Sequence, residues 1–215
     1  MGLSELARRA GLPKATTYRL LSQLEAVEAV ARVADGYAIG PAIARLGLTW
    51  QSYPGLGAAA SPVVRRAAAL SGSITGISEL HPAGYERLVT QMVGSIADLP
   101  RAQPSRILPP GTASGLLLRA LGPAADPPAS FSAREWRRMR WSISDTGTAA
   151  VEHADPVSIQ CFAAPVSTPG GQVVAAFFMI APGRRAVEKR LKDMVRRVAL
   201  EIGNTLRSMP PTAVR

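Results

Sequence analysis

The sequence predicts an α+β protein of two domains, and three observations support this prediction. Residues 3–25 hold two short amphipathic helical patterns that are separated by a Gly-Leu-Pro turn. The pair Asp35-Gly36 follows them and lies between two short β-prone runs, which is typical of a hairpin. After residues 53–57, helical patterns alternate with β-rich runs, as expected for helices packed on an antiparallel sheet.

The first helix is predicted from an apolar stripe that ends at a glycine. Its members are Leu3, Leu6, Ala7 and Ala10. Gly11 then occupies the position in which glycine commonly ends a helix. Pro13 suits the first position of the next helix, where a missing N–H has no cost. The spacing is that of a helix-turn-helix.

The second helix carries a different kind of residue on each side. Its apolar stripe consists of Thr17, Leu20, Leu21 and Leu24. The opposite side carries groups that can donate hydrogen bonds to phosphates or base edges, namely Lys14, Thr16, Tyr18, Arg19, Ser22 and Gln23. An ordinary solvated helix face is the alternative interpretation of this side.

The hairpin that follows is predicted from residues 27–33, the Asp35-Gly36 turn and residues 37–39. A hairpin directly after a recognition helix is a wing, and Arg32 on it can reach phosphate or the minor groove. Helix, turn, helix and hairpin in this order form a winged helix-turn-helix.

Residues 3–40 resemble the winged helix-turn-helix of the IclR family of bacterial transcriptional regulators. The family's Leu-x-x-Leu-Ala, Gly-Leu-Pro-Lys and Arg-Leu-Leu-x-x-Leu-Glu motifs are met by Leu3–Ala7, Gly11–Lys14 and Arg19–Glu25. The closing Tyr-x-Leu-Gly of the wing is matched by Tyr37, Ile39 and Gly40. The resemblance implies a double-stranded DNA operator as partner, contacted by Lys14, Thr16, Tyr18, Arg19, Gln23 and Arg32.

One departure concerns the start of this domain. Family members carry another helix before the position of Leu3, and this chain begins at Met1. We therefore expect Leu6, Leu20 and Leu24 to be partly uncovered. A misassigned start, a less stable domain and cover by a partner chain all remain open. The alternative function is an effector-binding or dimerisation module that has lost DNA binding.

The predicted domains are residues 1–40, a linker helix and break at 41–57, and a second domain at 58–215. In the second domain we expect helices at 60–70, 112–121, 132–140 and 184–209, with Gly203-Asn204 as a candidate interruption of the last. Strands are expected at 73–80, 85–93, 141–151, 157–166 and 173–181. Thr112 and Ser132 are predicted N-caps.

The second domain resembles the GAF-like, effector-binding half of the same family. The resemblance rests on Thr112-Ala113-x-Gly115, on Cys161–Val166 and on Val173–Ala176. It implies an effector held between the start of the 112–121 helix, whose free N–H groups favour anions, and the late strands. The implied contacts are Thr112, Ala113, Ser114, Cys161, Phe178 and Ile180.

Three departures make this implied pocket more apolar. Phe178 and Ile180 stand where carboxylate-binding relatives offer hydroxyls, and Leu116 replaces the family's lysine. Val151, beside Glu152, stands where many relatives have an acidic residue. We expect a larger or more hydrophobic effector, such as an aromatic or acyl compound. The alternative is that Phe178 and Ile180 fill the pocket and leave no site.

Composition agrees with a nucleic-acid partner. The net charge is +10 and the pI is about 10.9, with the basic excess largest toward the C-terminus. The single cysteine excludes an internal disulfide and fits a reducing cytosol. No apolar run is long enough for a membrane helix and no signal peptide is visible, so we expect a cytoplasmic protein. The family resemblance implies a homodimer or homotetramer.

The residue types that catalysis needs do not converge. His81 and His153 have no cysteine or carboxylate partners at metal-site spacing, so no metal is expected. Cys161 lies in a β-rich run, where a thiol usually acts as a small apolar group. The chain has no P-loop and no GxGxxG motif. We expect no enzymatic activity and no cofactor.

Overall fold

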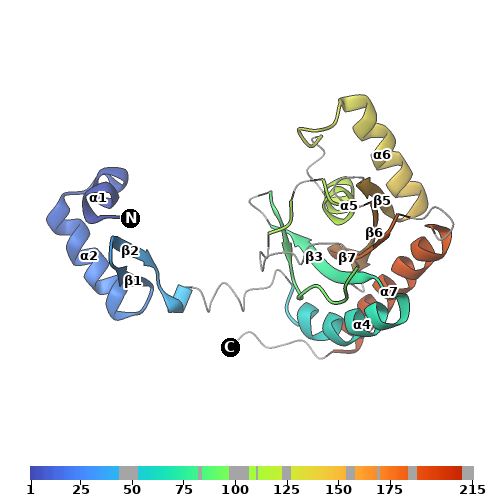
Figure 1. Cartoon of the computed structure of the whole chain (residues 1–215), viewed down its shortest axis with the longest axis horizontal. Coiled ribbons are helices and arrows are strands. Elements are labelled where there is room, and N and C mark those ends of the chain that lie inside the picture. Colours follow the sequence, from blue (N-terminus) through green and yellow to red (C-terminus); the bar gives the residue numbers. More distant parts are fainter. Residues whose placement is uncertain are drawn as a thin grey trace. The chain divides into compact units, whose positions relative to one another are not determined.

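The structure is a computed structural model, and it describes residues 1–43, 53–81, 84–96, 107–109, 111–122, 127–153, 158–168, 170–183 and 188–209. The chain divides into two compact units, Met1–Trp50 and Gln51–Arg215 (Figure 1). The first unit holds two helices and a hairpin, and the second holds a five-stranded sheet with helices. The predicted α+β class is thereby confirmed.

The first unit follows the predicted order. Helix α1 spans Leu3–Ala10, α2 spans Lys14–Ala26, and the antiparallel strands β1 and β2 span Val30–Val33 and Gly36–Ile39. Gly11, at φ 65°, ends α1 in the left-handed conformation that glycine adopts without strain. The chain therefore turns sharply between the two helices.

Two local predictions in this unit are wrong by one residue. Val33 pairs with Gly36, so the two turn residues are Ala34 and Asp35 rather than Asp35 and Gly36. Pro13 has an extended backbone and precedes α2, which begins at Lys14. The ring fixes φ at a value that both conformations share, so the sequence could not separate them.

The predicted linker helix lies mostly outside the described residues, since only Pro41–Ile43 of it are described. The next helix, α4, spans Leu56–Ser71 and begins four residues earlier than expected. Leu56 is fully buried in the core of the second unit, and this burial favours the additional turn of helix. Part of the predicted break at 53–57 is therefore helical.

The second unit is built on an antiparallel sheet in the order β4-β3-β7-β6-β5. The strands are β3 (Ile74–Leu80), β4 (Glu86–Leu88), β5 (Ala149–His153), β6 (Ile159–Ser167) and β7 (Val173–Pro182). The strand predicted at 85–93 is thus much shorter, although Val93 still forms a bridge with Thr75.

Helices cover both faces of this sheet, which makes three layers (Figure 1). Helix α4 and the long α7 (Glu188–Ser208) share one core with the residues on one face, among them Phe162, Phe177 and Met179. Helices α5 (Ala113–Leu121) and α6 (Ala133–Thr146) share a second core with the opposite face, which includes Cys161, Phe178 and Ile180. Strand alternation assigns each residue to its face.

The strand predicted at 141–151 and the C-terminal helix need correction. Residues 141–146 continue α6, because Trp136 and Ile143, seven residues apart, are both buried in the second core, and α6 ends at Gly147. Helix α7 runs through Gly203 and Asn204 without a break, since Ile202 and Leu206 extend its buried stripe. No described helix is long and apolar enough to cross a membrane.

Candidate functional site

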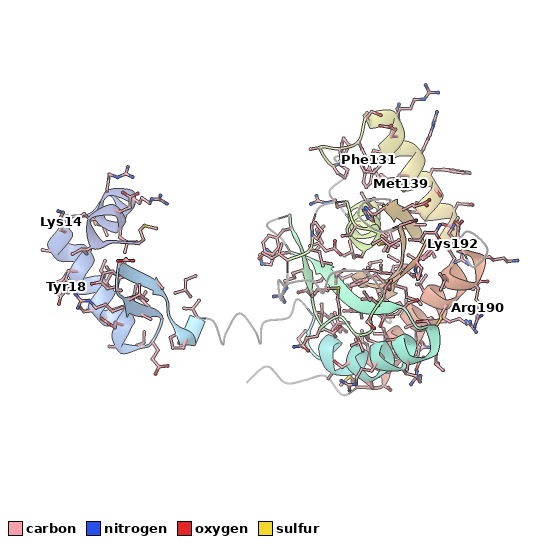
Figure 2. All side chains as sticks on the ribbon, in the orientation of Figure 1. Lys14, Tyr18, Phe131, Met139, Arg190 and Lys192 are labelled. Carbon is pink, nitrogen blue, oxygen red and sulfur yellow. The ribbon has the colours of Figure 1, made fainter. Side chains whose placement is uncertain are left out.

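Helix α2 presents a polar, solvent-exposed side. Lys14, Tyr18, Arg19 and Gln23 are exposed, whereas Thr16 is half-buried. Lys14 and Tyr18 lie one turn apart on this helix (Figure 2). The inward side is held by Leu21 and by Thr17, whose hydroxyl donates to the Pro13 carbonyl at 3.0 Å. The polar side chains of α2 are therefore free to approach a ligand from solvent.

The wing residue Arg32 is exposed but not isolated. It lies opposite Tyr37 across the hairpin, with its guanidinium carbon 5.8 Å from the centre of the tyrosine ring. The main chain of Met1 adds to this edge: its ammonium group donates to the Tyr37 carbonyl at 2.8 Å, and the Tyr37 N–H donates to its carbonyl at 2.9 Å. These contacts orient Arg32 on β1.

Part of the apolar stripe of α2 is open to solvent, as expected. Leu20 and Leu24 are 41% and 43% exposed, and Leu6 on α1 is half-buried. Leu21, on the same helix, is only 7% exposed. The core of this unit is therefore small, and it includes Ala7, Thr17, Leu21 and Tyr37.

The predicted effector residues come together on the α5 side of the sheet. Thr112 caps α5, its hydroxyl accepting from the Gly115 N–H at 3.0 Å, as predicted. Ala113 and Ser114 are buried in the first turn. Across from them, Cys161 pairs with Ile180 and Phe178 pairs with Gly76 in the sheet register. Ala113, Cys161 and Phe178 belong to a single core, and Ile180 packs against it.

The carboxylate of Glu86 lies at the start of α5. Glu86 opens β4 and is 6% exposed. Its Oε1 accepts from the hydroxyls of Ser78, at 2.5 Å, and Ser114, and its Oε2 accepts from the hydroxyl of Thr112. Sequence reasoning did not select Glu86 or Ser78. A charged residue that alternates with Leu88 on a strand is the only signal the sequence offers.

A second carboxylate, Glu79, is buried on the opposite face of the same two strands. It is 1% exposed and accepts a hydrogen bond from Arg87 Nε at 2.5 Å. Glu79 and Arg87 are register partners on β3 and β4, so strand pairing alone brings them together. This pair has a cationic partner for its carboxylate. In the described part of the chain, Glu86 has hydroxyl partners only.

Two cavities open elsewhere on this unit. The first, of about 530 Å³, lies between α6, β5 and α7, and its lining includes Phe131, Arg138, Met139 and Lys192 (Figure 2). The second, of about 310 Å³, lies between the end of α4 and the start of α7, and its lining includes Leu70 and Arg190. Figure 2 labels Arg190. None of the six predicted effector residues lines either cavity.

Comparison with known proteins finds similarity to one family. Residues 1–34 match the IclR helix-turn-helix domain. An IclR transcriptional regulator from Silicibacter sp. TM1040 is similar over the whole length, with 25% identity, 98% of this chain and 91% of that chain covered, and a TM-score of 0.72. The helix-turn-helix of this chain thus matches the IclR family, and the fold is similar to that of IclR regulators along the whole chain. No significant sequence match is found among curated proteins.

Two further IclR structures share the fold. The IclR homologue from Microbacterium hydrocarbonoxydans, solved with 4-hydroxybenzoate, has 22% identity and a TM-score of 0.74, with 97% of this chain and 92% of that chain covered. The IclR protein of Thermotoga maritima has 19% identity and a TM-score of 0.64, with 96% and 91% covered. At these identities the likeness shows the fold of this chain.

IclR proteins are transcriptional regulators and not enzymes, as predicted for this chain. The state of Cys161 agrees with this. The thiol is 9% exposed, and its pKa is raised to about 11, first by burial and second by the negative charge of Glu86. At neutral pH the thiol is protonated, whereas a nucleophilic cysteine needs a lowered pKa.

The two histidines of this chain lie in different settings. His81 stacks on Tyr85 with ring centres 4.4 Å apart, and His153 is exposed at the end of β5. Within the described residues, no three histidine, cysteine or acidic side chains lie close enough to hold a metal ion.

Proposed function

We propose that this IclR protein is a DNA-binding transcriptional regulator that works in the bacterial cytoplasm. The observation that carries the proposal is the exposed polar side of α2, directly after the sharp turn at Gly11. The major groove of B-DNA is about 12 Å wide and admits such a helix. Lys14, Arg19 and Gln23 then contact phosphates and base edges, and Thr16 and Tyr18 flank them.

The wing adds a second contact in this proposal. Arg32 is exposed on β1 beside Tyr37, so its charge is available to a phosphate or to the minor groove. Neutralising phosphates with basic side chains makes the affinity fall steeply with salt. Salt-sensitive binding is therefore the first property to expect.

The test is binding of the full-length protein to the DNA upstream of its own operon, followed by gel shift or fluorescence anisotropy. Arg19→Ala should weaken binding by about 1–3 kcal/mol, roughly 5- to 150-fold, because one base or phosphate contact is lost. Arg65→Ala is the matched control, since Arg65 is an exposed arginine on α4 in the other unit. Equal affinities for both variants and the parent chain would remove Arg19 from the interface.

A module without DNA binding is the second candidate. It is favoured by the exposure of Leu20 and Leu24 on α2, each of which contributes about 1.5–3 kcal/mol when fully buried. Without this contribution, the free energy that keeps α2 packed in the first unit is smaller. The same experiment separates the candidates, because such a module shows no salt-sensitive binding even at low salt.

We infer that the second unit binds a small-molecule effector of aromatic or apolar character. The relative from Microbacterium hydrocarbonoxydans is known with 4-hydroxybenzoate. In this chain the proposed contacts are those predicted from the sequence: Thr112, Ala113, Ser114, Cys161, Phe178 and Ile180. Titration calorimetry with a panel of small acids, phenols and acyl compounds tests this inference. Binding of two- and three-carbon acids alone would contradict it.

The open cavity between α6, β5 and α7 supports a second location for the effector. It combines an apolar side, Phe131 and Met139, with the cations of Arg138 and Lys192. A pocket of about 530 Å³ is large enough for an aromatic acid. Arg138→Met should abolish effector binding if the effector lies there, and should leave it unchanged if the effector lies beneath α5.

We also propose that the protein works as a homodimer or homotetramer. An effector then acts by binding better to one arrangement of two DNA-binding domains than to another. Because such coupling is reciprocal, operator DNA must change the affinity for the effector by the same factor. Light scattering gives the oligomeric state, and calorimetry with and without DNA gives the coupling.

A further inference from the structure

Glu86 is a buried carboxylate without a cationic partner among the described residues. It is 6% exposed and is held by three hydroxyls, those of Ser78, Thr112 and Ser114. Each hydroxyl donates to it, and an ionised carboxylate accepts at about four positions. Among the residues that the structure describes, these three donors leave roughly one acceptor position of the carboxylate unfilled.

The start of α5 is shaped around this carboxylate. A Cβ on Gly115 would lie 2.5 Å from Glu86 Oε2, so a larger residue there would force the two apart. Thr112 and Ser114, in the same turn, both direct their hydroxyls to Glu86. A helix start favours negative charge through its free N–H groups and its dipole. The protein's own carboxylate therefore occupies the position where an anionic ligand would bind.

Apolar side chains lie on the same face of the sheet as Glu86. Phe178 and Ile180 from β7 and Cys161 from β6 face the same side of the sheet. The Phe178 ring packs directly on Gly76, where an added Cβ would meet it at 2.6 Å. The charge of Glu86 also reaches Cys161, whose pKa it helps to raise.

We propose that Glu86 determines which class of effector this domain accepts, by taking the place of a carboxylate at the start of α5. A ligand that enters beneath α5 then meets one fixed negative charge with a free acceptor position and an apolar wall. It binds through a hydrogen-bond donor, as a phenol or a benzylic amine does, and a carboxylate is repelled. This inference rests on the proposed effector function of the second unit.

The first test asks whether the Glu86 position is an anion site. In Glu86→Ala, sodium acetate should raise the midpoint of thermal unfolding with a saturable dose dependence, relative to sodium chloride at equal ionic strength and to neutral acetamide. The parent chain should show no difference between acetate and chloride. An equal response of parent and variant, or none in the variant, overturns the proposal.

The second test asks about ligand class and uses Glu86→Gln, which keeps the shape of the side chain if the alanine variant fails to fold. Calorimetry on the full chain should show phenol or benzylamine binding at least tenfold more tightly than benzoate. Glu86→Gln should reduce this preference by about tenfold or more. Glu152→Gln, an exposed glutamate on β5, is the matched control and should leave the preference unchanged.

The outcomes separate this inference from the proposed function. Preference for benzoate in the parent chain, or a preference that Glu86→Gln does not change, overturns the role of Glu86. Absence of binding by all three aromatic probes also overturns it. If the protein does not bind operator DNA but still prefers ligands with a hydrogen-bond donor, the proposed DNA-binding function is contradicted and the proposed role of Glu86 is retained.

Discussion

At the scale of single residues, the second unit places two carboxylates of adjoining strands in different chemical settings. Glu79 faces the α4 side and pairs with Arg87. Glu86 faces the α5 side and is held by hydroxyls at the start of a helix. The alternation of the strands separates them, and this separation gives one a structural ion pair and the other a place at the proposed pocket.

Cys161 allows a prediction about pH. Its folded-state pKa of about 11 lies above the ordinary value of 9.0, because burial and the Glu86 charge disfavour the thiolate. Below pH 9 the folded protein keeps the thiol neutral, and its contribution to stability is complete there; it is lost as the pH rises toward 11. Native protein should therefore react with a thiol reagent such as iodoacetamide far more slowly than urea-unfolded protein at pH 8–9. Equal rates would contradict the buried, protonated state.

At the scale of elements, α6 shows how local signals compete. Trp141, Ile143 and Thr146 have high β propensity, and on that basis residues 141–151 were expected to form a strand. Residues 141–146 are helical because Trp136 and Ile143 are both buried on one side of α6, and because Ser132 and Glu135 form a reciprocal capping box at its start. Propensity is a weak guide where burial decides.

Removing this cap gives an element-scale prediction. Ser132→Ala should destabilise the second unit by about 0.5–2 kcal/mol, because the Glu135 N–H loses its acceptor. Hydrogen bonds from Ser132 also lower the pKa of Glu135, so part of the cap is lost as the pH falls below the ordinary value of 4.5. Urea unfolding at pH 7 measures the effect. Ser144→Ala, at an exposed position inside α6, is the control and should change stability by less than about 0.5 kcal/mol.

At the scale of the whole molecule, the two units have separate cores of very different size. The first includes Ala7, Leu21 and Tyr37, and leaves Leu20 and Leu24 exposed. The second has two extensive cores, one on each face of its sheet. A small domain buries a smaller fraction of its surface and is correspondingly less stable.

Calorimetric unfolding should therefore show two transitions, with that of the first unit at lower temperature. Leu21→Ala should lower only the first midpoint and Ile77→Ala only the second, since each removes a buried side chain from one core and costs about 2–5 kcal/mol. A single transition that both substitutions lower alike would show that the units unfold together.

The sequence by itself determined the parts of this protein that depend on neighbours along the chain. The helix-turn-helix follows from Gly11, Pro13 and two apolar stripes, and the α5 cap follows from Thr112, because these signals act within a few residues. The IclR resemblance rests on the same local motifs and is confirmed. The exposed polar side of α2 was also predictable from helical spacing alone.

Only the tertiary structure decided what fills the start of α5. Glu86 reaches it from β4, 26 residues before Thr112, and Ser78 reaches it from the neighbouring strand. The contact between these residues depends on the register of β3 with β4 and on the packing of α5 over that face of the sheet. Neither can be predicted from the spacing of residues along the chain. The family resemblance implied N–H groups that favour an anion at Thr112–Ser114, and in the fold the Glu86 carboxylate lies against this helix start.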